Sequence, residues 1–220
     1  MSANPLSHMP IPLMEDHEWD ALYRFNSGAD DCDFNENEWQ TTPIPNGLSA
    51  EAVYRLLPSA PTFEFGGYLT DSQIHFVECN ELSANTISSN LCTFHTHPTE
   101  VADTEPDLPS NKDIYSFLKW RQQRAITVGK ELIWIFDKTM ETIPVIKRLE
   151  SWERKTMILT FRKLTEDKVE NQAEAYVPIA LEALGLDWPT KTKHISNEFR
   201  KDWTDQLSAV LKFEVDCFQR

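Results

Sequence analysis

Two histidines separated by one residue, His95 and His97, form the pair whose chemistry is the simplest to infer from the sequence. They lie in a run rich in β-branched and aromatic residues that stops at Pro98, a pattern typical of a β-strand. Side chains at positions i and i+2 of a strand project from the same face, about 6.6 Å apart along the backbone. Two imidazoles at this spacing can bind one tetrahedral Zn²⁺. The pair alone leaves the question open, because most such pairs on a strand bind no metal.

Asp113 is the candidate for a third ligand, since a catalytic zinc takes three protein ligands and keeps one position for water. It follows Ser110 by three residues and precedes an amphipathic run. The same spacing is also an ordinary helix start, in which a serine caps the helix and an acidic residue three positions later completes a capping box. These two residues alone are compatible with both interpretations.

A further carboxylate lies upstream, where Glu64 begins the apolar, glycine-containing segment 64–69 that predicts a strand. Amide hydrolysis needs a group that takes a proton from water and passes it to the leaving nitrogen. A carboxylate that does not bind the metal can do this, so Glu64 is our candidate general base. Ser110 could donate a hydrogen bond to the developing oxyanion, or cap the helix, or do both.

Three short patterns, E-x-x-G-x-L at 64–69, H-x-H-P at 95–98 and S-x-x-D at 110–113, together resemble the JAMM (MPN+) zinc metalloprotease family. The resemblance covers roughly residues 48–150. It implies an MPN-like, cytidine-deaminase-like α/β fold with a mixed sheet flanked by helices. The implied zinc ligands are His95, His97 and Asp113, and the implied catalytic residues are Glu64 and Ser110.

The resemblance also implies a function, namely zinc-dependent hydrolysis of peptide or isopeptide bonds. The bond would follow the C-terminal tail of ubiquitin or a ubiquitin-like protein, which would be the expected partner. Bacterial and phage members of the family process other peptides, and some MPN domains are scaffolds without catalysis. Both alternatives stay open, although inactive members usually lack some of the ligands and this chain keeps all five positions.

The loop before Ser110 is several residues longer than is usual in the family, and it offers a rival third ligand. Within it, Thr104 and Asp107 also fit the S/T-x-x-D pattern. Pro109 would interrupt a helix that began there, whereas residues 114–124 have the pattern of a helix. The sequence therefore favours the aspartate three residues after Ser110 and leaves Asp107 as the alternative.

The helices and strands that must position these residues are predicted to form an α/β core over residues 47–150. An acidic, proline-containing extension (1–46) precedes it, and a helical extension (151–220) follows, with apolar residues at helical spacing over 169–184 and 199–211. A short helix is also possible at 15–25. Within the core we expect helices at Ala50–Leu57 and Ile114–Arg124, and strands at Thr62–Leu69, Gln73–Cys79, the histidine run, Leu132–Phe136 and Thr142–Leu149.

Charge and composition argue against several classes of protein. The net charge is −14, which makes nucleic acid an unfavourable partner. No apolar run approaches the roughly 18 residues of a membrane span, and the N-terminal residues lack the pattern of a signal peptide. The four cysteines show no C-x-x-C pairing. We therefore expect a cytoplasmic protein with reduced thiols.

Overall fold

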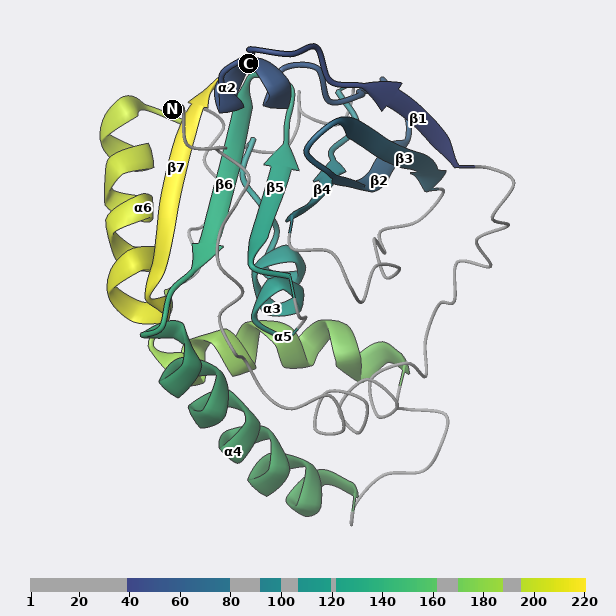
Figure 1. Ribbon diagram of the computed structural model, residues 1–220. Coiled ribbons are helices and arrows are strands. Elements are labelled where there is room, and N and C mark those ends of the chain that lie inside the picture. The colour runs from purple at the N-terminus through teal and green to yellow at the C-terminus, as the bar shows by residue number, and fades with distance from the viewer. Residues whose placement is uncertain (1–38, 80–91, 100–106, 120–121, 162–169, 188–194) are drawn as a thin grey trace.

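The computed structural model describes residues 39–79, 92–99, 107–119, 122–161, 170–187 and 195–220, and for Cys79, 154–161 and 170–176 it describes the backbone alone. Within these ranges the chain forms one seven-stranded mixed sheet with helices packed against it (Figure 1). The strands are β1 (Gln40–Pro43), β2 (Glu64–Leu69), β3 (Gln73–Cys79), β4 (Cys92–Thr96), β5 (Arg124–Val128), β6 (Leu132–Lys138) and β7 (Phe213–Gln219).

The strand order is β1-β3-β2-β4-β5-β6-β7. Strands β4 and β5 are parallel, and every other neighbouring pair is antiparallel. The sheet thus includes β1 from the predicted N-terminal extension and β7 from the predicted C-terminal one. The described helices are α2 (Ala50–Tyr54), α3 (Asn111–Lys119), α4 (Thr142–Phe161), α5 (Glu170–Leu184) and α6 (Asn197–Leu211).

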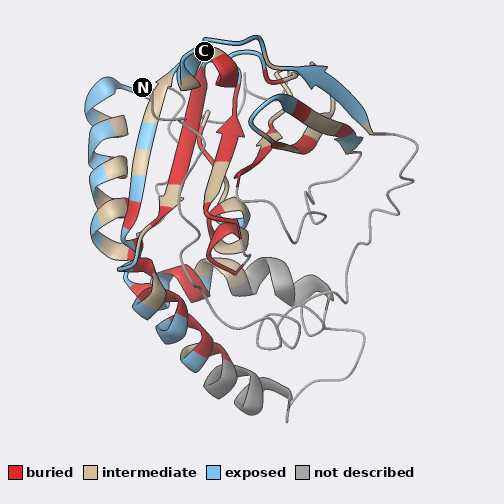
Figure 2. Cartoon of the chain, viewed as in Figure 1, coloured by how far each residue is buried: buried red, intermediate tan, exposed pale blue. Residues whose placement is uncertain are grey.

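Apolar side chains alternate along β6, so both faces of the sheet are covered. Trp134 and Phe136 pack with side chains from α3, α4, α5 and α6. Ile133 and Ile135 point to the opposite face, where they pack with side chains from α2, β2, β3 and β4. Figure 2 shows β6 buried along most of its length. None of the described helices combines the length and apolar composition that a membrane span needs.

Gly67 lies at a crowded point between β2 and its two neighbours. A Cβ there would lie 2.1 Å from the carbonyl oxygen of His75 and 2.7 Å from a ring carbon of Phe94. Only glycine leaves room for both, and Phe94 directly precedes His95 on β4. The absence of a side chain at Gly67 therefore allows β3, β2 and β4 to pack closely.

We expect Gly67→Ala to lower the free energy of unfolding by about 1–3 kcal/mol or more, because the new methyl group would overlap a backbone oxygen that is fixed in β3. Urea denaturation measures this change. Ser72→Ala, in the exposed turn between β2 and β3, is the control and should stay within about 0.5 kcal/mol of the parent protein. An equally small effect at Gly67 would contradict the close approach.

The strand predicted at residues 142–149 is wrong, because these residues form the first turns of α4. A turn at Thr139 leads into the helix, and the Thr139 hydroxyl accepts a hydrogen bond from the Glu141 amide at 3.1 Å. Pro144 lies in the first turn of α4, where backbone N–H groups have no partner within the helix, so the N–H that proline lacks is not needed. The β-branched residues of this segment suggested a strand, but Val145 and Leu149 are buried at helical spacing.

The helix predicted at residues 114–124 was too long and began too late. Helix α3 starts at Asn111 and ends at Lys119, and Arg124 begins β5. Strand β7 at Phe213–Gln219 was also missed, so the C-terminal region is not purely helical. The predictions of β3, β4, β6, α2, α5 and α6 are confirmed with shifts of a few residues. The possible helix at 15–25 lies outside the described residues.

Candidate metal centre

Strand β4 places the two histidines side by side. His95 is paired with Gly66 of β2 and with Thr127 of β5. His97 follows the strand directly, and its backbone N–H donates to the carbonyl oxygen of Val128 at 2.9 Å, which extends the parallel pairing past the end of β4. Both imidazoles therefore point from the same face, and their Nε2 atoms are 3.2 Å apart.

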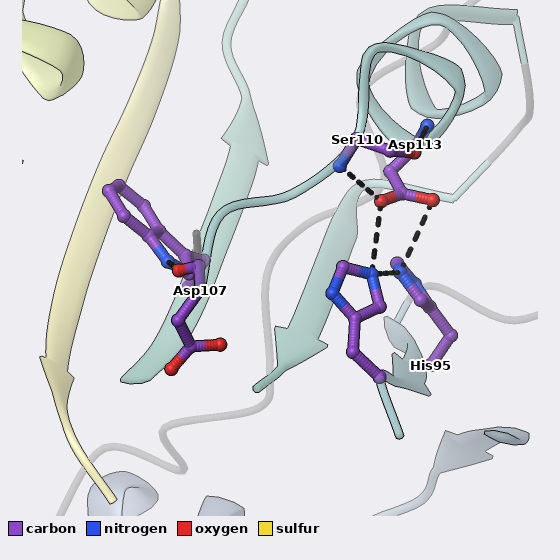
Figure 3. A network of polar contacts seen from close by, with 6 residues as sticks. His95, Asp107, Ser110 and Asp113 are labelled. Carbon is purple, nitrogen blue, oxygen red and sulfur yellow. Dashed lines mark hydrogen bonds and ion pairs between the residues drawn. The ribbon is translucent and has the colours of Figure 1, made fainter. Parts of the chain in front are cut away.

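Helix α3 brings Asp113 to the histidines. The Asp113 amide donates to Ser110 Oγ at 3.1 Å, and the Ser110 amide donates to Asp113 Oδ2 at 2.6 Å. This reciprocal pair is a capping box, so the helix-start interpretation of Ser110 is confirmed. The same carboxylate lies 3.2 Å from His95 Nε2 through Oδ1 and 3.4 Å from His97 Nε2 through Oδ2 (Figure 3).

The spacing of these donor atoms suits a small tetrahedral cation. Ligand atoms at about 2.0–2.1 Å from a tetrahedral zinc are about 3.3 Å from each other. Here the two Nε2 atoms are 3.2 Å apart, His95 Nε2 is 3.2 Å from Asp113 Oδ1, and His97 Nε2 is 3.4 Å from the other carboxylate oxygen, Oδ2. One ligand atom from each of the three residues lies within 4.8 Å of the other two. His95, His97 and Asp113 can therefore hold a metal ion together, and each can offer it one ligand atom.

The charges of the cluster also favour a cation. Burial opposes ionisation of Asp113, but the two histidines outweigh burial and hold the pKa of the carboxyl well below its usual range. For His95, burial disfavours the imidazolium, yet the charge and hydrogen bond of Asp113 prevail and raise its pKa. The ionised carboxylate thus attracts positive charge to this point, and a bound metal ion can supply it.

Glu64 lies beside this cluster without belonging to it. The antiparallel pairing of β2 with β4 ends where Gly66 lies opposite His95, and Glu64 is two residues before Gly66 on β2. Glu64 and Asp113 line one pocket with His95. Burial raises the pKa of the Glu64 carboxyl, although the two histidines pull it down.

Asp107, the alternative third ligand, is used elsewhere. Its Oδ2 accepts hydrogen bonds from the Glu131 and Leu132 amides, both at 2.7 Å. Its carbonyl oxygen accepts a bond from Trp134 Nε1 at 3.0 Å. Its carboxylate thus lies at the turn between β5 and β6, and Figure 3 shows Asp107 apart from His95. Thr104 lies outside the described residues.

Two residues at the site were not expected from the sequence. Thr96 is fully buried, and its Oγ1 accepts from the Phe65 amide at 2.8 Å, which ties the strand carrying Glu64 to the strand carrying the histidines. Lys112 lines the same pocket, and its charge acts to lower the pKa of Glu64. The alternation of side chains along β4 indicates that Thr96 faces the core. Its hydrogen-bond partner, the Phe65 amide, depends on strand pairing, which no local sequence pattern encodes.

Comparison of the chain with protein-family models, with curated proteins and with solved structures finds no match. The fold and the site together define a mixed α/β protein with a His-His-Asp cluster that can hold a metal ion.

Proposed function

We propose that the protein is a JAMM-type, zinc-dependent hydrolase with an MPN-like fold. It would cleave peptide or isopeptide bonds after the tail of ubiquitin or a ubiquitin-like protein. The observation that carries the proposal is the convergence of His95, His97 and Asp113, with Glu64 lining the same pocket. The choice of substrate is supported by the resemblance of the motif.

Two imidazoles and one carboxylate are a donor set that suits zinc. The three side chains are partly buried, with 16 to 21% of each exposed, so solvent and a substrate can reach them. When bound there, zinc would polarise the scissile carbonyl and lower the pKa of water to about 7.

Glu64 carries the proton in this proposal. It accepts a proton from the attacking water as the water oxygen bonds to the carbonyl carbon. It then gives that proton to the nitrogen as the C–N bond breaks. Burial raises the pKa of Glu64, which makes its carboxylate a stronger base toward the attacking water.

Ser110 has two roles that are compatible. Its Oγ accepts the hydrogen bond from the Asp113 amide that completes the capping box. A hydroxyl has one donor and two acceptor lone pairs, so the O–H can donate at the same time. We assign that donor to the oxyanion that forms at the carbonyl during attack.

The zinc site is tested by metal content. The parent protein is expected to carry about one zinc per chain, and His95→Ala or His97→Ala is expected to lose it, since two ligands hold zinc far more weakly than three. Elemental analysis of protein purified without chelators gives the ratio. His75→Ala is the matched control and should keep its zinc, because His75 lies on β3 and stacks on Tyr68. A parent protein with no zinc would overturn the proposal.

A further inference from the structure

Helix α3, which carries Asp113 in its first turn, is joined further along to a buried carboxylate of α4. Glu153 Oε1 accepts a hydrogen bond from the Tyr115 hydroxyl, and Oε2 accepts one from Lys119 Nζ, both at 2.5 Å. The side chains of Lys119 and Glu153 form an ion pair and are only 6% and 8% exposed. We call Tyr115, Lys119 and Glu153 the Glu153 cluster. It connects the helix that bears a metal ligand to a neighbouring helix.

The two donors of the Glu153 cluster lie on one side of α3, because residues four apart in a helix are neighbours. Successive residues of an α-helix are rotated by about 100°, so Asp113, two residues before Tyr115, points about 160° away from it. Asp113 lines the pocket that contains His95, together with Ser116 and Phe117, which lie three and four positions later. Glu153 therefore contacts the side of α3 that is opposite to the metal ligand.

The rotation of α3 about its own axis decides where the carboxylate of Asp113 lies. Side chains of an α-helix extend about 5–6 Å from the helix axis, so a rotation of about 10° moves an atom at that radius by about 1 Å. Distances from a metal ion to its ligands are held to within about 0.2 Å. A small rotation of α3 would therefore take Asp113 out of range of an ion held by the two histidines.

Apolar packing alone restricts such a rotation only weakly. Ile114, Phe117 and Leu118 bury one side of α3 in the core, but the hydrophobic effect is non-directional. Cores whose apolar residues are exchanged lose a unique arrangement before they lose stability. Hydrogen bonds are directional, and two of them, one helical turn apart on the same carboxylate, oppose both rotation and sliding of α3.

The ion pair in this cluster adds little to stability that apolar residues could not provide. Removal of two charges from water offsets much of their attraction, and well-packed apolar residues of similar volume are often as stabilising or more. Replacing Lys119 and Glu153 together by apolar residues should therefore keep the fold. What the replacement removes is the directional restraint on α3.

We propose that Glu153 is a positioning residue of the metal centre. Through Tyr115 and Lys119 it fixes the rotation of α3 at which Asp113 meets the two histidines. The inference rests on the proposed zinc site, but it concerns ligand geometry alone and does not depend on hydrolysis. It predicts that zinc affinity can be lost while the stability of the fold is kept, which a merely structural residue would not allow.

The first experiment replaces the Glu153 cluster in the full-length protein by apolar residues of similar size. This apolar variant combines Tyr115→Phe, Lys119→Met and Glu153→Leu. Its midpoint of urea denaturation should not fall, because the new side chains can pack where the ion pair was. Its zinc affinity, measured by chelator competition, should fall about tenfold or more, the loss typical of changes to residues that orient metal ligands.

The matched control removes the same three kinds of side chain on the opposite face of the sheet. There Arg124 forms an ion pair with Asp137 at 2.7 Å and donates a hydrogen bond to the hydroxyl of Tyr54, also at 2.7 Å. Tyr54 belongs to the core cluster on the side of the sheet away from α3. The combination of Tyr54→Phe, Arg124→Met and Asp137→Leu should therefore bind zinc as tightly as the parent protein.

Equal zinc affinity in the apolar variant and the parent overturns the inference, and so does an equal loss of affinity in the control. If the apolar variant is less stable than the parent or does not fold, Tyr115→Phe alone replaces it, with Tyr54→Phe as its control. Each of these two variants loses one hydroxyl that is hydrogen-bonded to a charged side chain. Only Tyr115→Phe should lose zinc affinity, and equal affinities would overturn the inference.

The second experiment measures the geometry without any metal. Crystal structures of the metal-free parent and of the apolar variant, or of Tyr115→Phe in its place, give the position of α3. In the parent, Asp113 Oδ1 lies 3.2 Å from His95 Nε2, and in the variant we expect α3 to be rotated and this distance to grow by about 1 Å. An unchanged α3 overturns the inference. If the parent binds no zinc, the hydrolase proposal fails, and this comparison alone decides whether Glu153 positions α3.

Discussion

Replacing Glu64 with glutamine is expected to slow turnover by a factor of about 10²–10⁴ while zinc stays bound. The two side chains have nearly the same shape, so the fold and the ligand cluster of His95, His97 and Asp113 should persist. The amide cannot accept the proton that hydrolysis must move. Single-turnover kinetics on a ubiquitin-like fusion that the parent protein cleaves measure the change in rate. Elemental analysis measures whether zinc stays bound.

Glu78→Gln is the control for this substitution, because Glu78 is exposed on the neighbouring strand β3. It should cleave as fast as the parent protein. Substrate binding should survive in Glu64→Gln, so this variant can capture its substrate from a lysate. A Glu64→Gln protein that keeps full activity would exclude Glu64 as the base, and one that loses zinc would make it a ligand.

Removing Asp113 and removing Asp107 should have opposite consequences. Asp113→Ala is expected to weaken zinc binding at least about 100-fold, since it deletes one of three ligands. Asp107→Ala is expected to keep zinc and to lower the free energy of unfolding by about 1–3 kcal/mol, because the Glu131 and Leu132 amides lose their acceptor.

Chelator competition gives the zinc affinity of each variant, and urea denaturation gives its stability. Asp113→Asn serves as a milder companion, because an amide oxygen can still accept the bond from Ser110 that the capping box uses. Retention of zinc in Asp113→Ala, with loss in Asp107→Ala, would move the third ligand to Asp107.

Two parts of the His-His-Asp cluster could be predicted because each of them is local. Strand alternation places His95 and His97 on one face, and a capping box fixes Asp113 against Ser110. What the sequence did not reveal is how the helix and the strand meet. That depends on the packing of α3 against β6, which involves residues distant in sequence.

The errors in the fold have physical causes too. At residues 142–149, β-branched side chains favoured a strand, but the turn at Thr139 and burial at helical spacing prevailed. Strand β7 alternates in burial along part of its length, a period-two signal that could have identified it. Its partner β6 precedes it by three helices, and nothing local in β7 indicates that pairing.

One oxygen atom, Oδ2 of Asp113, belongs to two structures at once. It accepts the Ser110 amide that starts α3 and lies 3.4 Å from His97 in the ligand cluster. Occupancy by a cation and helicity of the first turn are therefore thermodynamically linked, and the linkage is reciprocal. A substitution that stabilises the helical conformation of α3 would therefore strengthen cation binding, even where the substituted residue lies far from the ligands. Conversely, removal of the cation would destabilise the first turn of α3 and leave the sheet intact.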